Sequence, residues 1–289
     1  MKIAASELIL NPDGSVYHLH LQPGQVADTV ITVGDSDRVA EITKHFDAIE
    51  FTTQNREFKT QTGTYKDKRI TVISTGIGTD NIDIVLNELD AVVNINLKTR
   101  EIKRDITSLD IIRIGTSGSI SDTIALDSFV VSKMAIGFDN VLHFYTNGAV
   151  QELDVAKSFI QHTGWFKKKS APYIISADAA LAEKFSSSRT KSGITATNVG
   201  FYGPQGRVLR LPLQDPDLNS KLATFIYKDL FITNMEMETA GIYGLSNLLG
   251  HKAVSLNAII ANRVSGAFSM NPAKVVEELI QYALACIIK

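Results

Sequence analysis

Cysteine and long apolar stretches are scarce in this 289-residue sequence. The single cysteine, Cys286, excludes an internal disulfide and a zinc site made of Cys-x-x-Cys pairs. Because one thiol in a long chain fits a reducing compartment, we expect a cytoplasmic protein. No apolar run approaches the roughly 20 residues of a membrane helix, so the sequence predicts no membrane partner.

An excess of charge of one sign is also missing. Lysine and arginine number 29 and the acidic residues 31, which gives a net charge of -2. We therefore expect no broad nucleic-acid surface, and any anion must bind at a local group of basic residues. Linker-like tracts and repeats of fixed period are absent as well, so the sequence predicts one domain over residues 1–289.

Short β-rich runs alternate with helical patterns along the whole chain. Runs of β-branched residues indicate strands, and apolar residues three or four positions apart indicate helices. This alternation favours an α/β fold around a mixed sheet. We expect strands over 29–33, 58–65, 69–74, 110–114, 129–135 and 253–261, and helices over 37–46, 80–97, 152–162, 179–185, 217–227, 238–249 and 272–288.

Ligands in such folds bind where strands end, and four of these places carry unusual residues. After the first strand, Gly34 allows close backbone approach, and Arg38 adds a charge to a helix N-terminus that already favours anions. Arg113 interrupts an apolar strand, and a buried arginine needs an anionic partner. Gly115 and Gly118 follow it and flank two hydroxyl residues. Two alternatives to anion binding remain open: Arg38 is an ordinary surface arginine, or Arg113 forms an internal pair with an aspartate.

The third and fourth places suit an uncharged ring and a sugar. Phe201 can stack on a flat ring, and Gln205 and Arg207 together can read carbonyl and N–H groups. Glu236 and Glu238 lie where a strand meets a helix, and a carboxylate is a good acceptor for a diol. The alternative for the third place is a glycine- and proline-rich loop that only covers the core. The alternative for the fourth place is that the acidic residues are there because the helix dipole favours them.

Together these segments resemble the uridine phosphorylase branch of the nucleoside phosphorylase family. The resemblance extends from Tyr17 to Arg263. It implies a single-domain α/β/α sandwich around a mixed, partly barrel-like sheet, and phosphorolysis of uridine to uracil and ribose 1-phosphate. Whether deoxyuridine and thymidine are also substrates is left open. Its most specific parts are Gly-Asp-x-Asp-Arg at 34–38, Arg-Glu-Phe at 56–58, Ser-Thr-Gly-Ile-Gly at 74–78, Arg-Ile-Gly-Thr-Ser-Gly at 113–118 and Glu-Met-Glu-Thr-Ala at 236–240.

The resemblance also implies a role for individual residues. Arg113, Gln205 and Arg207 are the implied catalytic residues, and Arg56 and His18 would reach the site of a neighbouring subunit. No cofactor and no metal are implied, because inorganic phosphate is a substrate. The implied ligands are Gly34, Arg38, Arg56, Arg113 and Thr116 for phosphate, His18, Met237 and Glu238 for ribose, and Phe201, Gln205, Arg207, Ile260 and Arg263 for uracil.

Several alternatives stay open beside this interpretation. Purine-specific relatives usually carry an aspartate within the stretch that corresponds to 257–263, which contains no acid here, and this favours a pyrimidine. The retained arginines favour phosphate over water as nucleophile. A purine nucleoside phosphorylase, a nucleosidase and a non-catalytic nucleoside-binding protein are the alternatives. We expect a homo-oligomer, a dimer or a hexamer, and leave open a monovalent cation near Glu57 and Ser74 and the role of segment 87–109.

Overall fold

The computed structural model describes residues 2–146 and 148–289, and within them one mixed sheet of twelve strands forms the centre. A separate two-stranded hairpin consists of β5 (Ile95–Asn96) and β6 (Glu101–Ile102). The strands of the main sheet are β1 (Thr29–Val33), β2 (Ala48–Asn55), β3 (Phe58–Tyr65), β4 (Lys68–Ser74), β7 (Asp110–Ser119), β8 (Phe129–Gly137), β9 (Tyr173–Ser176), β10 (Thr190–Thr197), β11 (Ile226–Tyr227), β12 (Leu230–Glu236), β13 (Lys252–Asn262) and β14 (Ala267–Phe268).

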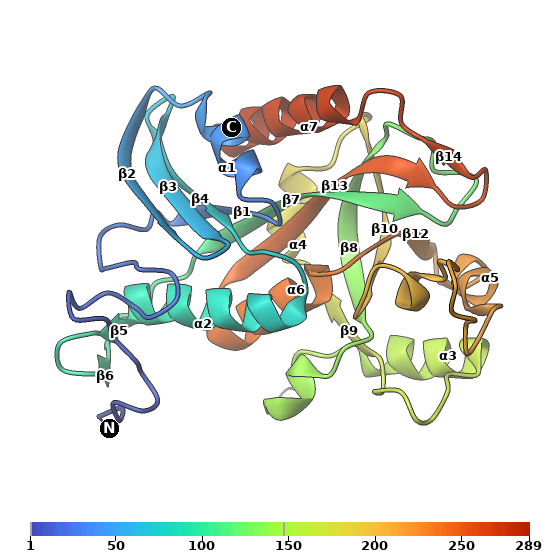
Figure 1. Cartoon of the computed structure of the whole chain (residues 1–289), viewed down its shortest axis with the longest axis horizontal. Coiled ribbons are helices and arrows are strands. Elements are labelled where there is room, and N and C mark those ends of the chain that lie inside the picture. The colour runs from blue at the N-terminus through green and yellow to red at the C-terminus, as the bar shows by residue number, and fades with distance from the viewer. Residues whose placement is uncertain (1, 147) are drawn as a thin grey trace.

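Five of these strands close into a ring. Strand β13 lies between β7 and β8, and β10 and β12 follow β8. Strand β12 then returns to β7, where Asn234 and Met235 pair with Ser119 and Gly118. Strands β1, β4, β3 and β2 continue from β7 as an open extension, which lies on the left of Figure 1. The prediction of a mixed, partly barrel-like sheet is therefore confirmed.

Helices pack against both faces of the sheet. They are α1 (Asp37–Thr43), α2 (Thr79–Asn94), α3 (Leu153–Thr163), α4 (Ala179–Lys184), α5 (Leu218–Ala223), α6 (Thr239–Leu249) and α7 (Pro272–Ile287), with 3-10 turns η1 (Val141–Phe144) and η2 (Gly203–Gln205). Successive strand residues point to opposite faces. Val30 therefore packs in the core with α2 and α6, and Ile31 in the core with α1, α4 and α7. Figure 1 shows α7 and α2 on opposite sides of the sheet, as the predicted α/β/α arrangement requires.

The structure corrects several predicted boundaries. Strand β7 continues to Ser119, because residues 110–119 pair with β13, so the predicted loop at Gly115–Ser119 is part of the sheet. Helix α5 ends at Ala223, since Ile226 and Tyr227 turn back onto β12. Helix α1 ends at Thr43 and α2 at Asn94, short of the predicted ends. Strands β2, β9, β10 and β12 were not predicted.

The start of helix α7 agrees with its sequence signal. Asn271 caps α7 by accepting a hydrogen bond from the backbone N–H of Lys274, with Pro272 at the first helical position, as predicted.

The segment 87–109 contains the end of α2 and the hairpin β5–β6, whose Glu101 pairs with Lys2. Among the described residues, no helix is long and apolar enough to cross a bilayer.

Candidate active site

A cavity of about 730 Å³ opens at the carboxyl ends of β1, β7, β12 and β13. Parallel strands β1, β7 and β13 end at the same edge of the sheet, so residues far apart in the sequence meet there. Ten of the thirteen predicted ligand residues line this cavity: Gly34, Arg38, Arg113, Thr116, Phe201, Gln205, Arg207, Met237, Glu238 and Ile260.

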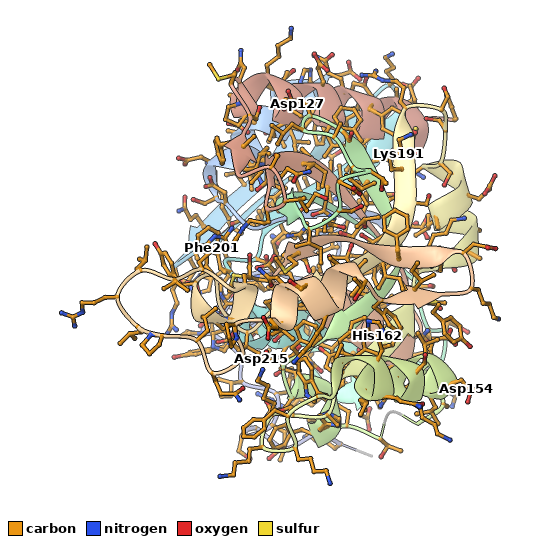
Figure 2. The ribbon with its side chains drawn as sticks, turned by 90° about the vertical axis from the view of Figure 1, so that its right-hand side faces the viewer. Asp127, Asp154, His162, Lys191, Phe201 and Asp215 are labelled. Atoms are coloured by element: carbon orange, nitrogen blue, oxygen red, sulfur yellow. The ribbon has the colours of Figure 1, made fainter. Side chains whose placement is uncertain are left out.

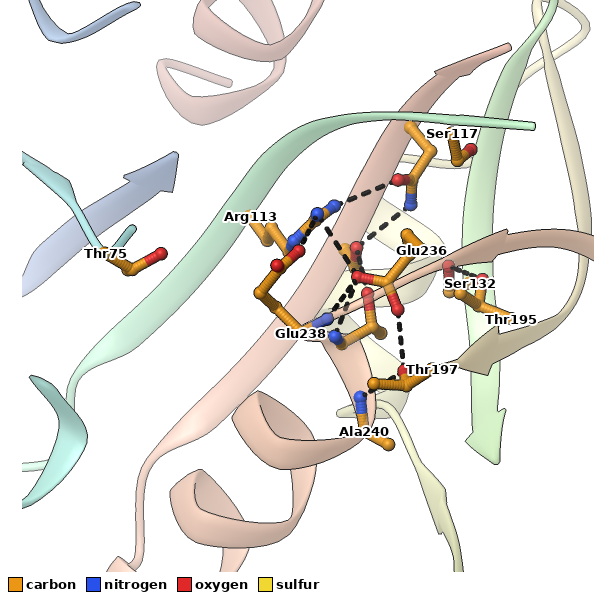
Figure 3. Close-up of polar contacts among 12 residues, drawn as sticks. Thr75, Arg113, Ser117, Ser132, Thr195, Thr197, Glu236, Glu238 and Ala240 are labelled. Carbon is orange, nitrogen blue, oxygen red and sulfur yellow. Dashed lines mark hydrogen bonds and ion pairs between the residues drawn. The ribbon is translucent and has the colours of Figure 1, made fainter. Parts of the chain in front are cut away.

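Arg113 lies at the centre of a buried polar network on the cavity floor (Figure 3). Its Nη2 donates to Glu238 Oε2 at 2.6 Å and lies 3.2 Å from Glu236 Oε2, while Nη1 donates to Asn257 Oδ1 at 2.9 Å. Burial disfavours the charge of Arg113, but the two glutamates outweigh it and raise the arginine pKa. The anionic partners are therefore two glutamates, and the alternative of an internal Arg–Asp pair is wrong.

Gly115 makes room for this arginine. The guanidinium of Arg113 folds back along its own strand, so a Cβ at position 115 would lie 1.9 Å from Nη1. No pair of heavy atoms can approach so closely without a bond between them. Gly115 lines the cavity and also leaves the space that the Arg113 side chain occupies.

Glu236 and Glu238 have different hydrogen-bond partners. Glu236 Oε2 accepts from the backbone N–H groups of Glu238 and Thr239 at 2.9 Å each, and its Oε1 accepts from the Thr197 hydroxyl at 2.6 Å. These bonds satisfy free N–H groups at the start of α6 and fix the backbone of Glu238. Glu236 is therefore the residue whose side chain caps the start of α6.

Glu238 faces the cavity from the opposite side of this junction. Its Oε1 accepts from the backbone N–H of Gly78 at 2.9 Å, and its Oε2 receives the bond from Arg113. Burial raises the pKa of Glu238 against the opposing attraction of Arg113, and the neighbouring charge of Glu236 raises it further. The carboxylate is thus a strong acceptor at the cavity wall that becomes protonated more readily than an exposed glutamate.

Arg38 supplies a second guanidinium at this end of the cavity. Its Nε is buried and has no hydrogen-bond partner among the described residues, and Glu41 Oε2 lies 3.9 Å away on the same helix. Burial lowers the pKa of Arg38, and the nearby charge of Arg113 acts in the same direction. We call Gly34, Arg38, Arg113 and Thr116 the arginine end. Two cations facing one space suit an anionic ligand.

The opposite end of the cavity is formed by the loop around η2. Arg207 Nη1 donates to the side-chain oxygen of Gln205 and to the backbone oxygen of Phe201, both at 2.6 Å. The Arg207 guanidinium also lies 3.7 Å from the centre of the Phe201 ring. Because Gln205 Oε1 accepts this bond, its NH₂ group is left to donate toward the cavity. We call Phe201, Gln205 and Arg207 the loop end.

Arg263 and Ile260 bring β13 to the loop end. Ile260 lines the cavity, as predicted. Arg263 is outside the lining, and its guanidinium donates to the backbone oxygens of Gln205 and Gly206 at 3.4 and 3.3 Å. In this structure Arg263 therefore braces the backbone of the loop, and its charge adds to burial in lowering the pKa of Arg207.

His18 and Arg56 do not line the cavity of their own chain. His18 Nδ1 lies 2.7 Å from Glu88 Oε1 on α2, and Arg56 is exposed at the turn between β2 and β3. Their predicted reach into a neighbouring subunit stays a prediction. Glu57 lines the cavity rim, and Ser74 is buried behind it, with its hydroxyl donating to the Glu57 backbone oxygen at 2.5 Å.

Sequence reasoning missed the role of Asn257. This side chain is fully buried, accepts from Arg113, and donates to the Ser255 hydroxyl at 3.1 Å. The available signal was a polar amide in the middle of an otherwise apolar strand, a position where a buried group needs partners.

Comparisons with known proteins agree with this geometry. A model of the Phosphorylase superfamily matches residues 28–287. A uridine phosphorylase from Thermococcus kodakarensis is 30% identical over 276 residues, which is 92% of this chain and 84% of that protein. A DeoD-type purine nucleoside phosphorylase from Colwellia psychrerythraea is 28% identical and covers 83% of this chain and 84% of its own length.

A solved structure gives the same fold. The nucleoside phosphorylase from Trypanosoma brucei, which shows uridine phosphorylase activity, superposes with a TM-score of 0.86 at 29% identity, over 96% of this chain and 99% of that one. The chain belongs to the Phosphorylase superfamily. The prediction of a pentosyl-transferring enzyme of the nucleoside phosphorylase family is confirmed.

Proposed function

We propose that the protein cleaves uridine by phosphorolysis, giving uracil and ribose 1-phosphate. One observation carries the proposal. A single cavity is lined by two guanidiniums at its arginine end, by the paired Gln205 and Arg207 at its loop end, and by Glu238, which is bonded to Arg113. These three sets of groups offer the partners that phosphate, base and sugar each need.

The arginine end supplies the nucleophile. Arg38 and Arg113 hold a phosphate oxygen near C1′ of the ribose, and Gly34 and Thr116 complete the phosphate site. Glu238 accepts a hydrogen bond from a ribose hydroxyl, and Met237 packs against the sugar. Phosphate replaces Glu238 in part as the partner of Arg113. The protein thus needs no side-chain nucleophile, and its contribution is positioning and charge stabilisation.

The loop end stabilises the leaving group. As the N-glycosidic bond breaks, its electron pair moves to the uracil ring and negative charge develops on the ring oxygens. Arg207 and the Gln205 amide donate to those oxygens, Phe201 stacks on the ring, and Ile260 covers it. One such donor is typically worth about 2.7–4 kcal/mol of transition-state free energy.

A pyrimidine fits this cavity better than a purine. Its acidic lining side chains are Asp35, Glu57, Glu236 and Glu238, of which the last two are bonded to Arg113. Residues 257–263, in β13 and just beyond it, contain no acid, so the stretch offers no group to protonate N7 of a purine. The uridine phosphorylase from Thermococcus kodakarensis and the activity of the Trypanosoma brucei protein support the same choice.

The test is ultraviolet detection of free base from uridine, with and without inorganic phosphate, and with inosine as control. We expect uracil release only when phosphate is present, and little release from inosine. Release without phosphate would indicate a nucleosidase and contradict the role of the arginine end. Faster cleavage of inosine would indicate a purine enzyme, and binding without cleavage a non-catalytic protein. Deoxyuridine and thymidine in the same assay measure sugar tolerance.

A further inference from the structure

A second cavity, of about 480 Å³, lies on the other side of the η2 turn. None of the thirteen predicted ligand residues lines it. It opens where β8 and β10 end, which are parallel neighbours, and is closed by the start of α5. Gly203 and Pro204 line this cavity, while the next residue, Gln205, lines the active site. One short turn therefore borders both spaces.

Figure 2 labels one lining residue of each cavity. Phe201 lines the active-site cavity and Asp215 the second cavity, and in this view the loop between them projects from the body of the protein. We call this second space, lined among others by Phe138, Trp165 and Asn198, the rear cavity. Its volume is within the range of about 300–1,000 Å³ that is usual for small-molecule sites.

Asn198 provides a polar group without a partner at the rear cavity. Its side chain is 2% exposed, and its Oδ1 accepts no hydrogen bond from the described residues. The rest of the residue is held in place, because Nδ2 donates to the Ala196 oxygen at 3.1 Å and the backbone N–H to the Glu236 oxygen at 2.8 Å. A buried acceptor in a fixed position without a donor is unfavourable, so it favours a ligand that brings one.

Three other polar side chains around Asn198 already have partners. Asp139 accepts from the Tyr173 hydroxyl at 2.6 Å and from the backbone of Val141 at 2.9 Å. Asp215 binds Lys221 at 2.9 Å, and the indole N–H of Trp165 donates to the Ser170 oxygen at 2.8 Å. The remaining polar lining residues are Asn140, Lys169, Ser170 and Gln214. Among the described lining atoms, Asn198 Oδ1 is the buried one that needs a donor, so the ligand has to supply one there.

Aromatic side chains determine the shape of that surface. The rings of Phe138 and Trp165 lie 4.7 Å apart, tilted by 31°, and together form an aromatic wall, and Lys169 Nζ lies 4.9 Å from the centre of the Trp165 ring. Pro204, Leu213 and Leu218 add apolar surface from the loop and from α5. A flat ring covers such a wall well.

We propose that the rear cavity binds a planar aromatic molecule that carries one O–H or N–H donor, with its ring against Phe138 and Trp165 and its donor on Asn198 Oδ1. Such a ligand touches Gly203 and Pro204, which directly precede Gln205. Occupancy therefore changes the position of the Gln205 amide and, with it, the KM for the nucleoside. The binding itself is independent of the proposed function, and only the effect on KM rests on it.

Trp165 makes the binding measurable, because it is the only tryptophan in the sequence. The probe is 2-naphthol, and 2-methoxynaphthalene is the matched molecule without a donor. Both are titrated into the full-length protein with uracil and phosphate at saturating concentration, so that the active site is occupied. We expect saturable quenching of Trp165 emission, with 2-naphthol binding at least about tenfold more tightly. Equal affinities, or quenching that does not saturate, would overturn the proposal.

Three variants locate the bound probe. Asn198→Leu should abolish the preference for 2-naphthol, because the acceptor is lost while the volume is kept. Leu213→Phe should weaken both probes at least about fivefold by filling the cavity, whereas Leu211→Phe, on the same loop but outside the cavity lining, should leave binding unchanged. Thermal unfolding checks that each variant is folded. Unchanged binding in folded Leu213→Phe, together with displacement by uracil, would place the probe in the active site and contradict the proposal.

Kinetics test the link to the loop end. At saturating 2-naphthol we expect the KM for uridine to change at least about twofold and the KM for phosphate to stay constant. An unchanged KM for uridine would show that occupancy of the rear cavity does not affect the loop end. If the protein binds 2-naphthol with the expected preference but cleaves no nucleoside, the proposed function fails and the rear cavity stands.

Discussion

The arginine end and the loop end of the active-site cavity are built in different ways. Arg113 comes from the middle of β7, inside the closed ring, and is bonded to residues of β13 and of the junction between β12 and α6. Gln205 and Arg207 come from a loop that meets the rest of the molecule mainly through Arg263 and Asn219, whose amide donates to the Gln205 oxygen at 3.1 Å.

Because of this difference, we expect changes at the two ends to affect the stability of the fold and the choice of base to different degrees. At the arginine end, Arg113 is bonded to Glu238, Glu236 and Asn257, so a change of this residue affects folding and catalysis together. At the loop end, the hydrogen bonds of the Arg207 side chain to described residues all stay within its own loop. The base-reading groups can therefore change with little effect on folding, and the phosphate-binding groups cannot.

The largest effect is expected for Arg113→Ala. The change leaves Glu236 and Glu238 buried without their cation, which costs about 3–5 kcal/mol of unfolding free energy, and it removes a phosphate ligand. We expect urea unfolding to shift accordingly and kcat/KM to fall by about a thousandfold or more. Arg189→Ala is the control, because its exposed pair with Glu278 is worth about 0–1 kcal/mol. Wild-type stability in Arg113→Ala would contradict the comparison.

Arg207→Ala should separate activity from stability. The loss of one donor to the leaving uracil predicts a fall of about 10²–10³-fold in kcat/KM for uridine. Unfolding free energy should change by less than about 0.5 kcal/mol, because this side chain is only partly buried and bonds within its own loop. The exposed Arg210 on the same loop provides the matched control, Arg210→Ala. An unchanged kcat/KM in Arg207→Ala would remove this residue from the site.

The raised pKa of Glu238 predicts a pH effect on sugar binding. As the pH falls through this pKa, the carboxylate gains a proton and becomes a much weaker acceptor for a ribose hydroxyl. At saturating phosphate, the KM for uridine should then rise by about tenfold per pH unit, beginning above the ordinary titration range of a glutamate. Glu238→Gln is the comparison, since it should have a raised KM at every pH without this acidic rise. The same acidic rise in Glu238→Gln would assign the effect to another group.

A smaller and more selective effect is expected for Asn257→Ala. This change removes the acceptor of Arg113 Nη1, and a hydrogen bond to a charged group is worth about 1.5–3 kcal/mol. Steady-state kinetics should show a KM for phosphate raised about tenfold and a KM for uridine changed less than about twofold. Ser255→Ala, which removes the next group in the chain of bonds, should give the same pattern more weakly. A larger effect on uridine than on phosphate would show that Asn257 does not act through Arg113.

The sequence predicted much of this architecture because the relevant signals are local. Strand β1 and the hairpin of β3 and β4 follow from β-branched runs, and the start of α7 follows from Asn271 and Pro272. Strand β10 was missed because Lys191, Ser192 and Gly193 interrupt its apolar pattern. The structure shows that Gly193 is needed there, since a Cβ would lie 2.3 Å from Thr233 on β12.

The site was predictable as a set of residues but not as a network. Ten of thirteen predicted ligand residues line one cavity, because each lies at or just beyond the end of a strand or in a motif with a recognisable pattern. The pairing of Arg113 with Glu238 joins positions 125 residues apart, and the distance between such positions is set by the closure of the ring. No local pattern carries that information.

Gly115 has a consequence for how this enzyme can vary. Residue 115 has no side chain, and the guanidinium of Arg113 lies in the space that a Cβ would occupy. Alanine scanning normally asks what is lost when atoms are deleted, and at this position the informative change is the addition of one methyl group. Gly115→Ala would keep every charge of the site and still displace Arg113, so the absence of a side chain at position 115 contributes to the site as much as any side chain.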